Sequence, residues 1–301
     1  MALIVNTNVA SLNAQRNLST TSSALSTSLQ RLSSGLRINS AKDDAAGLAI
    51  VEGLNSRVRG DQQAIRNAND GISLAQTGEG ALGQIGNNLQ RIREIAVQAS
   101  NGTVSDTNRS QLQKEVDQLT QEISRIVTTT EFNGTHLFVT GAAASGIAAA
   151  GLTFQVGSDG SATNQVTIAS GDLFLASGLG GSTTATSGGL NSYATSLTAT
   201  GTISVLNTGA ASATIAQIDA DIGIVSNSRS TFGAIQNRFE AVIANLQNYV
   251  ENLSASRSRI QDADFAEETA KLTRNQILQQ AGTAILSQAN SVPQQALSLL
   301  R

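Results

Sequence analysis

The sequence predicts a mainly α protein: a long antiparallel helical bundle, or coiled coil, formed by both chain ends, with a β-rich central insertion. Apolar residues recur at spacings of three and four toward both ends of the chain, a pattern typical of helices packed along one seam. Pro293 is the only proline among 301 residues, and proline strongly interrupts helices. Between Glu131 and Asp219 the only acidic or basic residues are Asp159 and Asp172, and Gly, Ser, Thr and Ala dominate instead.

Composition excludes several classes of protein. The formal net charge is −3 and no run of Lys or Arg could follow a phosphate backbone, so we expect no nucleic-acid partner. The chain has no cysteine, which excludes a disulfide framework and thiolate chemistry. No stretch reaches the apolar length of a membrane span, so we expect no membrane partner. The first eight residues lack the basic start and apolar run of a signal peptide, which predicts a cytoplasmic location unless a dedicated machine reads an uncleaved signal.

The first long helix is predicted between Asp44 and Ser100. If it is continuous, it is about 85 Å long, at 1.5 Å per residue. Asp43 and Asp44 are expected to be the N-terminal charges of this helix, where the helix dipole favours them. The expected apolar stripe consists of Leu54, Val58, Ile65, Ala68, Ile72, Ala75, Leu82, Ile85, Leu89, Ile92, Ala96 and Ala99.

Two further helices should complete the bundle. Asn101-Gly102 predicts a turn, and Asp106 is the expected N-cap of the next helix. Three helices of matching period would bury their stripes in a shared core. The stripe of the second helix is Leu112, Val116, Leu119, Ile123 and Ile126, and that of the third runs Ile215, Ile218, Ile222, Val225, Phe232, Ile235, Phe239, Val242, Leu246 and Leu253.

The long helix carries an unusual number of glycines, each of which costs roughly 1 kcal/mol relative to alanine in a helix interior. Two interpretations are open. The glycines either permit close approach of a neighbouring helix or mark breaks and kinks. The glycines in question are Gly53, Gly60, Gly71, Gly78, Gly80, Gly83 and Gly86.

The central segment has the signals of short strands and turns. Leu152–Val156 and Gln165–Ile168 alternate apolar and polar residues, and Ser158-Asp-Gly160 is a turn sequence. We therefore predict a β-rich segment over 131–211.

The two extreme ends are amphipathic, but neither has a folded domain beside it in the sequence. Their partners are expected to be each other or copies in neighbouring subunits, because a short helix needs packing to be stable in water. The N-terminal stripe is Leu18, Leu25, Leu29, Leu32 and Leu36, and the C-terminal stripe is Leu272, Leu278, Ala281, Ile285, Ala289, Val292 and Leu299.

Several runs in both ends closely resemble bacterial flagellins, the subunits of the flagellar filament. They occur in the family's order over about residues 1–135 and 212–301. The runs that carry the resemblance are Val5–Arg16, Leu32–Ile50, Asn67–Gln76, Gln90–Val97, Gly233–Phe239, Ser258–Glu268 and Ala281–Arg301.

The resemblance implies a division of labour along the chain. Residues 1–43 and 259–301 would be the helices of an inner tube, and 44–130 and 212–258 would form the surrounding shell bundle. Residues 131–211 would be a β-rich variable segment with at most a small outer projection. In the inner tube, the implied packing residues are Leu18, Leu25, Leu29, Leu32, Leu278, Ile285 and Val292.

The resemblance also implies function and partners. The chain would be a structural subunit that polymerises with itself into the helical filament used for motility. It would be exported unfolded by the flagellar type III apparatus, without a cleaved signal, and would end outside the cell. An export chaperone, the filament cap and hook–filament junction proteins are the implied partners.

One motif implies a further partner. The run that starts at Gln90 resembles the segment through which many flagellins contact the Toll-like receptor that detects flagellin, and by position Gln90, Arg91, Ile95 and Glu115 would make the contacts. Because Asn101-Gly102 reverses the chain, Arg91 and Glu115 are expected to face the same side of adjacent helices. The alternative is a solvated face of a bundle helix, the commoner role of such charges.

No catalytic, cofactor or metal site is predicted. His136 is the only histidine, which excludes zinc motifs that need two histidines, and no phosphate-binding Gly-Lys-Ser/Thr loop is present. Glu267 and Glu268 are expected to lie on a solvated helix face. Two alternatives to a filament subunit are a hook–filament junction protein and a secreted adhesin or enzyme with helical stalks.

Overall fold

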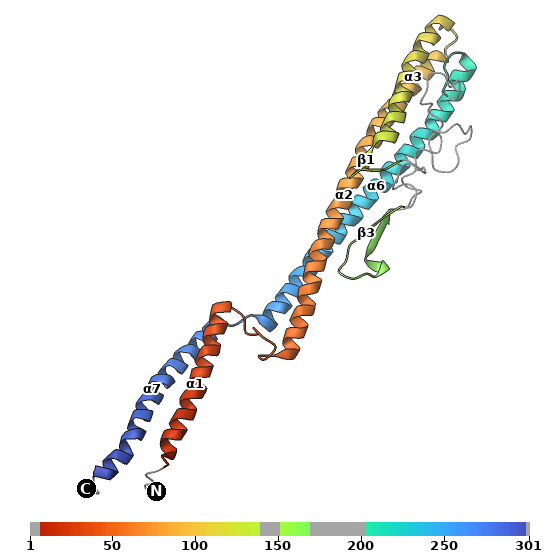
Figure 1. Ribbon diagram of the computed structural model, residues 1–301. Coiled ribbons are helices and arrows are strands. Elements are labelled where there is room, and N and C mark those ends of the chain that lie inside the picture. Colours follow the sequence, from red (N-terminus) through yellow and green to blue (C-terminus); the bar gives the residue numbers. More distant parts are fainter. Residues whose placement is uncertain (1–6, 139–150, 169–202, 299–301) are drawn as a thin grey trace. The chain divides into compact units, whose positions relative to one another are not determined.

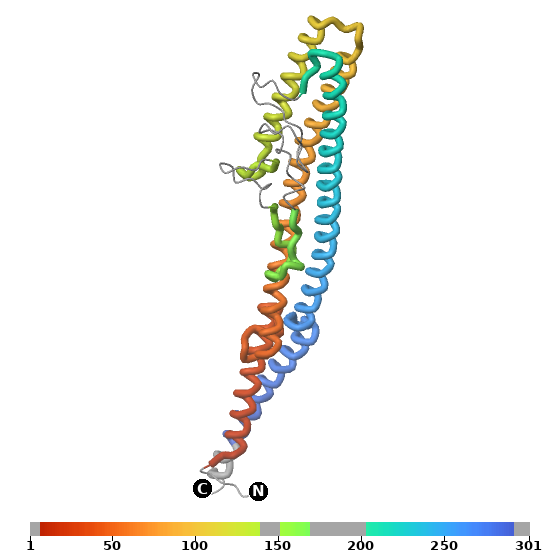
Figure 2. Tube along the Cα trace, turned by 90° about the vertical axis from the view of Figure 1, so that its right-hand side faces the viewer, coloured from red at the N-terminus to blue at the C-terminus, as the bar shows by residue number. Residues whose placement is uncertain are grey.

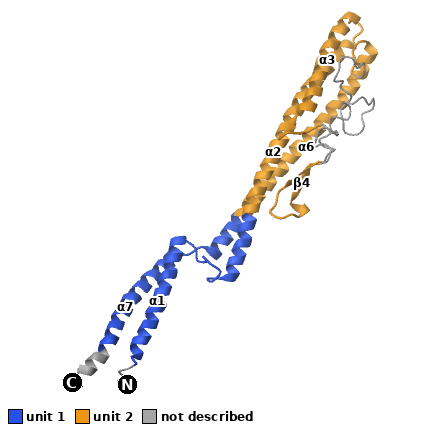
Figure 3. Cartoon of the chain, in the orientation of Figure 1, with its two compact units in different colours: residues 1–58, 251–301 blue, residues 59–250 orange. Residues whose placement is uncertain are grey.

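The computed structural model describes residues 7–138, 151–168 and 203–298, with only the backbone described for 292–298. This part of the chain is mainly helical and falls into two compact units, residues 1–58 with 251–301 and residues 59–250 (Figures 1 and 3). The helices are α1 (Val9–Ser34), α2 (Ala45–Ala99), α3 (Asp106–Thr129), α6 (Thr208–Gln261) and α7 (Phe265–Ser298). The strands are β1 (Glu131–Phe132), β2 (Thr135–His136), β3 (Leu152–Gln155) and β4 (Gln165–Ile168), with a short 3-10 helix at Ala162–Asn164.

The long helix predicted between Asp44 and Ser100 is confirmed as α2, which is unbroken over 55 residues. The Asp44 carboxylate accepts a hydrogen bond from the backbone N–H of Gly47 at 2.8 Å, so it satisfies one of the free donors at the helix start. Asp43 instead fastens the preceding loop, because its carboxylate accepts from Ser40 N–H at 2.9 Å and from Asn39 N–H at 3.2 Å. These backbone donors, chiefly that of Ser40, lower the pKa of Asp43.

The prediction that Asp106 is the N-cap of α3 is wrong by one residue. Ser105 has the extended backbone of an N-cap, and its hydroxyl accepts from Asn108 N–H at 3.3 Å. Both residue types cap helices well, so the sequence did not distinguish them. Asp106 lies in the first turn, where its charge favours the helix dipole.

Arg109 holds the turn between α2 and α3 from the inside. Its side chain is buried, and Nε donates to the Ala99 carbonyl and Nη2 to the Asn101 carbonyl, each at 2.9 Å. Asp106 is its counter-ion, at 2.8 Å. The guanidinium therefore satisfies carbonyls that the end of α2 leaves without a helical partner.

The core of the second unit lies along the seam of α2, α3 and α6. Figure 2 shows α2 and α6 side by side within this unit. The predicted stripes are buried or half-buried there, including Leu82, Ile85 and Leu89 at 0% exposure. The three-helix prediction is therefore confirmed for this part of the chain.

The structure shows close approach of a neighbouring helix at two of the seven glycines of α2, Gly71 and Gly78, and a break in the helix at none of them. A Cβ added at Gly71 would lie 2.6 Å from the ring of Phe239, and one at Gly78 would lie 2.8 Å from the ring of Phe232. Each glycine thus leaves a hole that an aromatic ring of α6 fills. Gly71 and Gly78 are seven residues apart on α2, and Phe232 and Phe239 are seven residues apart on α6. At Gly80 an added Cβ would meet nothing within 4 Å, yet α2 continues unbroken there.

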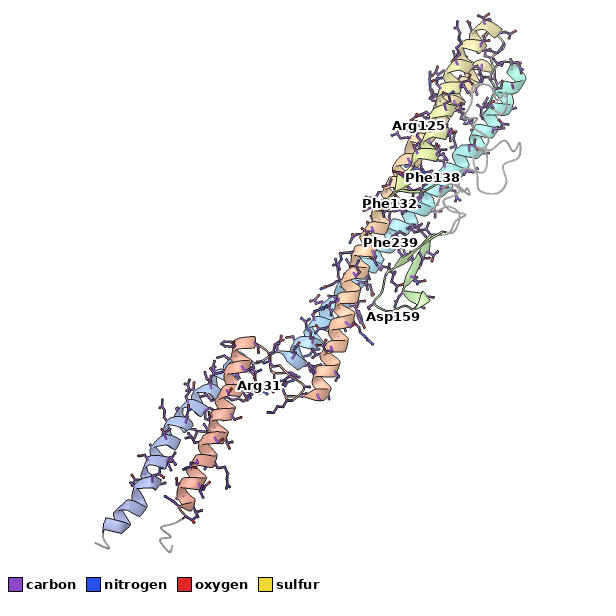
Figure 4. The ribbon with its side chains drawn as sticks, in the orientation of Figure 1. Arg31, Arg125, Phe132, Phe138, Asp159 and Phe239 are labelled. Carbon is purple, nitrogen blue, oxygen red and sulfur yellow. The ribbon has the colours of Figure 1, made fainter. Side chains whose placement is uncertain are left out.

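Two antiparallel hairpins belong to the predicted β-rich segment. In β1–β2, Asn133 (φ 52°) and Gly134 (φ 74°) have the left-handed backbone of a tight two-residue turn. Strands β3 and β4 confirm the short strands predicted at 152–156 and 165–168, and they pair antiparallel. Phe154 of β3 packs edge-on against Phe239 of α6, which Figure 4 labels, with ring centroids 5.3 Å apart, and this contact anchors the hairpin to the helices.

The chain re-enters the bundle through a short segment held at its backbone. The Gln113 amide donates to the Ile203 carbonyl at 3.2 Å and accepts from Val205 N–H at 2.7 Å. The Thr214 hydroxyl donates to the Ser204 carbonyl at 2.9 Å. Val205 is fully buried, so this segment forms part of the core.

In the first unit, α1 and α7 run antiparallel along one another (Figure 1). At one end the Asn8 side chain donates to the Ala289 carbonyl at 2.7 Å, and at the other Ala263 N–H donates to the Gly35 carbonyl at 2.9 Å. The residues of α1 that this packing buries are small: Ser11, Ala14 and Ser28.

Candidate interaction surfaces

The terminal helices expose many large apolar side chains. Small residues in the α1–α7 contact allow the two helices to approach closely, but they cover little apolar area. Contiguous exposed apolar surface marks an association site in soluble proteins. The exposed set is Val9 (65%), Leu12 (52%), Leu29 (49%), Phe265 (61%), Ile277 (60%), Leu278 (50%) and Ile285 (60%).

The residues predicted for inner-tube packing divide into two groups. Leu18, Leu25 and Leu32 are half-buried, and a Cβ at Gly282 of α7 would lie 3.3 Å from Leu18 Cδ1. These leucines therefore give part of their surface to α1–α7 packing. The remaining predicted residues are Leu29, Leu278 and Ile285, which are exposed, and Val292, whose side chain lies outside the described part of the chain.

Four exposed apolar residues were missed by the sequence reasoning: Val9, Leu12, Phe265 and Ile277. Val9 and Leu12 lie outside the leucine stripe, which continues from Leu18 to Ala14 and Ser11, so the periodicity gave no signal for them. Ile277 was hidden because its neighbour Leu278 already occupied the predicted stripe. Both are at least half exposed, so the apolar surface of α7 is wider than one stripe.

Charge is scarce on these two helices. Arg16 and Arg31 are the only charged residues of α1, and α7 has none after Arg274. Removing a charge from water costs several kcal/mol unless it is paired, whereas a neutral surface has no such cost. The ends are therefore suited to being enclosed by other copies of the chain.

A second surface lies where α2 meets α3. Arg91 Nε donates to Glu115 Oε1 at 2.8 Å, and Arg91 Nη1 donates to Glu94 Oε2 at 3.0 Å. Hydrogen bonding to Glu115, and then to Glu94, raises the pKa of Arg91. This confirms the predicted geometry, with Arg91 and Glu115 on the same side of adjacent helices. Gln90 is exposed next to them.

Ile95 differs from the other three residues of the implied receptor surface. It is 1% exposed and belongs to the core cluster of the bundle. Its side chain therefore has no free surface for a partner, and Gln90, Arg91 and Glu115 are the members that a partner can reach.

A third ion pair links α2 to α6. Arg93 Nε donates to Asp219 Oδ1 at 2.6 Å, and both side chains are about half exposed. The hydrogen bond from Arg93 lowers the pKa of the Asp219 carboxyl.

Two features are absent from the part of the chain that the structure describes. None of the described helices combines the length and apolar character needed to cross a membrane. Across the same residues, no three His, Asp or Glu side chains gather as metal ligands would.

Family models match both ends of the chain. The model described as the bacterial flagellin N-terminal helical region matches residues 5–142, and the one described as the C-terminal helical region matches residues 215–300. These matches define the class as helical proteins of the bacterial flagellum.

Two curated relatives cover the whole chain and are themselves wholly covered. Flagellin D of Vibrio cholerae serotype O1 is 39% identical over 386 aligned positions, and polar flagellin B/D of Vibrio parahaemolyticus is 38% identical over 381. The chain belongs to the bacterial flagellin family. It is a structural subunit of the flagellar filament that polymerises with itself, and it is not an enzyme.

One solved structure adds a similarity of fold. A protein described as a flagellar hook-associated protein from Vibrio parahaemolyticus superposes with a TM-score of 0.55 at 15% identity. The match covers 73% of this chain and 100% of the other. At this identity the likeness concerns the fold alone.

Proposed function

We propose that the terminal helices α1 and α7 form the inner tube of the filament and bury their apolar residues against neighbouring copies. Residues 1–43 and 259–301 would then make the tube, 44–130 and 212–258 the shell, and 131–211 the variable segment. The observation that carries this proposal is the exposure of Leu29, Leu278 and Ile285, the last two of which lie on the part of α7 that has no charged residue.

The family also supports proposals about the route and the other partners of the chain. The subunit is exported unfolded by the flagellar type III apparatus and acts outside the cell in motility. On the way it meets an export chaperone, and in the filament it meets the cap and the hook–filament junction proteins.

Negative-stain microscopy of the purified full chain tests the filament role. Long filaments of uniform width are expected, because the exposed apolar surface is buried by association. Protein that stays monomeric when seeded with filament fragments would contradict the proposal.

The hook–filament junction alternative has less support. The hook-associated likeness is at 15% identity, whereas the flagellin relatives are 38–39% identical over whole chains. The microscopy separates the two, because a junction protein would not extend into long filaments. The adhesin or enzyme alternative needs a convergent polar constellation in the central segment, and the sequence shows none.

We propose further that Gln90, Arg91 and Glu115 form a contact surface for the flagellin-sensing Toll-like receptor. The observation that favours it is the exposed Arg91–Glu115 pair, which presents a fixed guanidinium and carboxylate on adjacent helices. A few residues near the centre of an interface contribute most of its affinity, and arginine is among the residue types enriched there.

The test is Arg91→Ala combined with Glu115→Ala in the full chain. A reporter assay with monomer should show at least a tenfold loss of potency, while circular dichroism remains native because both side chains are exposed. The matched control is Arg125→Ala with Glu122→Ala, which removes a similar exposed ion pair from α3. Wild-type potency of the folded Arg91/Glu115 variant would leave only a solvated helix face.

A further inference from the structure

A cleft between α1 and α7 gathers most of the charge that these two helices carry. Its volume is about 360 Å³, and Arg31, Lys271, Arg274 and the buried carboxylate of Glu268 line it together with small residues of α1 such as Ser28. Figure 4 labels Arg31 close to the C-terminal end of α1. Outside the cleft the only charged residues of these two helices are Arg16 and Glu267, so most of their charge is gathered at the cleft.

The cations of the cleft are not fully satisfied within one chain. Lys271 is paired with Glu267 at 2.7 Å, and it lies 3.9 Å from Glu268. Arg31 Nε is buried without a hydrogen-bond partner, which is costly for a charged donor. Within the described part of the chain, Arg274 forms no ion pair.

A nearby acid of the same chain does not fill this role. Asp43 is close enough for Arg31 to contribute to lowering its pKa. Its Oδ2 atom, however, already accepts hydrogen bonds from Asn39 N–H, Ser40 N–H and the Ser40 hydroxyl. The Asp43 carboxylate is thus committed to its own loop.

We propose that the cleft is a socket for a carboxylate side chain of a second copy of this chain. A planar carboxylate matches the donor geometry of a guanidinium, and Arg31 and Arg274 would be the donors. The inference rests on the proposed role of α1 and α7 in polymerisation, because the socket continues the exposed apolar surface of these helices. The socket would add a polar contact that sets the register between neighbouring copies. Apolar contacts alone specify register poorly.

Three acids of the first unit can supply the carboxylate. Glu52, Glu251 and Asp262 are exposed, and in the described part of the chain no hydrogen bond or ion pair occupies their carboxylates. Glu267 and Asp264 are less suitable, because Glu267 is paired with Lys271 and Asp264 accepts from Ala266 N–H at 2.9 Å.

The experiment measures the critical concentration for polymerisation of the purified full chain. Arg274→Gln and Arg31→Gln should each raise it about tenfold or more, and the wild type should lose this advantage as salt is raised. The matched control is Arg16→Gln, which removes the other arginine of α1 away from the cleft and should leave the critical concentration unchanged. Circular dichroism must show native helix content in every variant.

A charge exchange identifies the donor of the carboxylate. Arg274→Glu should block assembly, and one of Glu52→Arg, Glu251→Arg or Asp262→Arg in the same chain should restore it. A loss that none of the three reverses overturns the socket, and so do Arg31→Gln and Arg274→Gln variants that polymerise like wild type. Phosphate that stabilises the monomer through Arg274 without affecting assembly overturns it as well, in favour of a small anion.

The socket and the inner-tube proposal fail separately. Normal assembly after charges are placed in the leucine stripe would overturn the inner-tube assignment, whereas normal assembly after Arg31 and Arg274 are neutralised overturns only the socket.

Discussion

In this flagellin, the α1–α7 contact of the first unit and the core of the second unit bury different kinds of side chain. In the second unit, α2 and α6 interlock large groups, such as Phe232 in the hole at Gly78 and Phe239 in the hole at Gly71. In the first unit, the α1–α7 contact buries Ser11, Ala14 and Ser28 of α1, and large apolar groups remain exposed on both helices. The filled core is complete within one chain, whereas the α1–α7 region leaves apolar surface that neighbouring copies would cover in the proposed inner tube.

Helix α1 and the second unit also differ in how they use charge. Ion pairs cross between helices of the second unit, from Arg91 to Glu115 and from Arg93 to Asp219, where both partners keep contact with water. In the first unit, α1 has two arginines and no acid. Exposed ion pairs cost little, whereas enclosed charge costs much, so the charge-poor stretches, α1 and the part of α7 after Arg274, are the ones suited to being enclosed.

The largest effect is expected from charges introduced into the apolar surface of α1. Leu25→Asp with Leu29→Asp should abolish filament formation, because an enclosed unpaired charge costs several kcal/mol. The second unit should keep its helix content by circular dichroism, since neither leucine belongs to its core. Leu25→Met with Leu29→Met preserves the apolar surface and should still polymerise. Normal filaments from the aspartate variant would refute the assignment of these residues to a buried contact between subunits.

The next effect separates the units by their local stability. In the monomer, backbone amides of α1 should exchange with solvent orders of magnitude faster than those of α2 around Leu82–Leu89, because α1 buries few apolar groups. In the filament the amides of α1 should become protected. Hydrogen exchange followed by mass spectrometry measures both states. Equal protection of α1 and α2 in the monomer is the result that would contradict this contrast.

Two glycine substitutions in α2 test whether the holes for aromatic rings contribute to the stability of the second unit. Gly78→Ala should lower the free energy of unfolding by about 1–3 kcal/mol, because the added methyl overlaps the buried ring of Phe232. Gly80→Ala should raise it by up to about 1 kcal/mol, because that position is open and alanine favours the helix. Urea denaturation of the monomer measures both. If both substitutions changed the free energy of unfolding in the same direction, the hole at Gly78 would not explain the effect of Gly78→Ala.

The smallest effect concerns the Arg93–Asp219 pair. The hydrogen bond from Arg93 lowers the pKa of Asp219 in the folded state. The ionised Asp219 therefore stabilises the fold above its ordinary pKa of about 3.9, and this contribution is lost as pH falls through the folded pKa. Arg93→Gln should therefore be slightly less stable than wild type at pH 7 and equally stable in strong acid. The control is Arg66→Gln, whose side chain donates to Gln63 rather than to an acid. A difference that persists in acid would exclude the ion pair as its source.

Periodicity alone determined the helices and much of the core. Spacings of three and four placed α2 within a residue of its observed bounds, and alternation placed β3 and β4. The family motifs determined the class, because several long runs in the same order leave little room for coincidence. The exposed and half-buried leucines of α1 also agree with a stripe that has no core of its own in the sequence.

Only the tertiary structure showed the features that depend on packing between helices. Ile95 was expected at a surface, but α3 covers α2 there, so the buried strip widens to include both Ile92 and Ile95. The sequence gives no reason to treat Gly78 and Gly80 differently. In the structure only Gly78 faces the ring of Phe232, so only Gly78 provides a hole for a side chain of α6. A sequence determines which face of a helix is apolar, because that depends on local periodicity. How many helices cover that face, and with which side chains, depends on residues far away in the chain, and packing selects them.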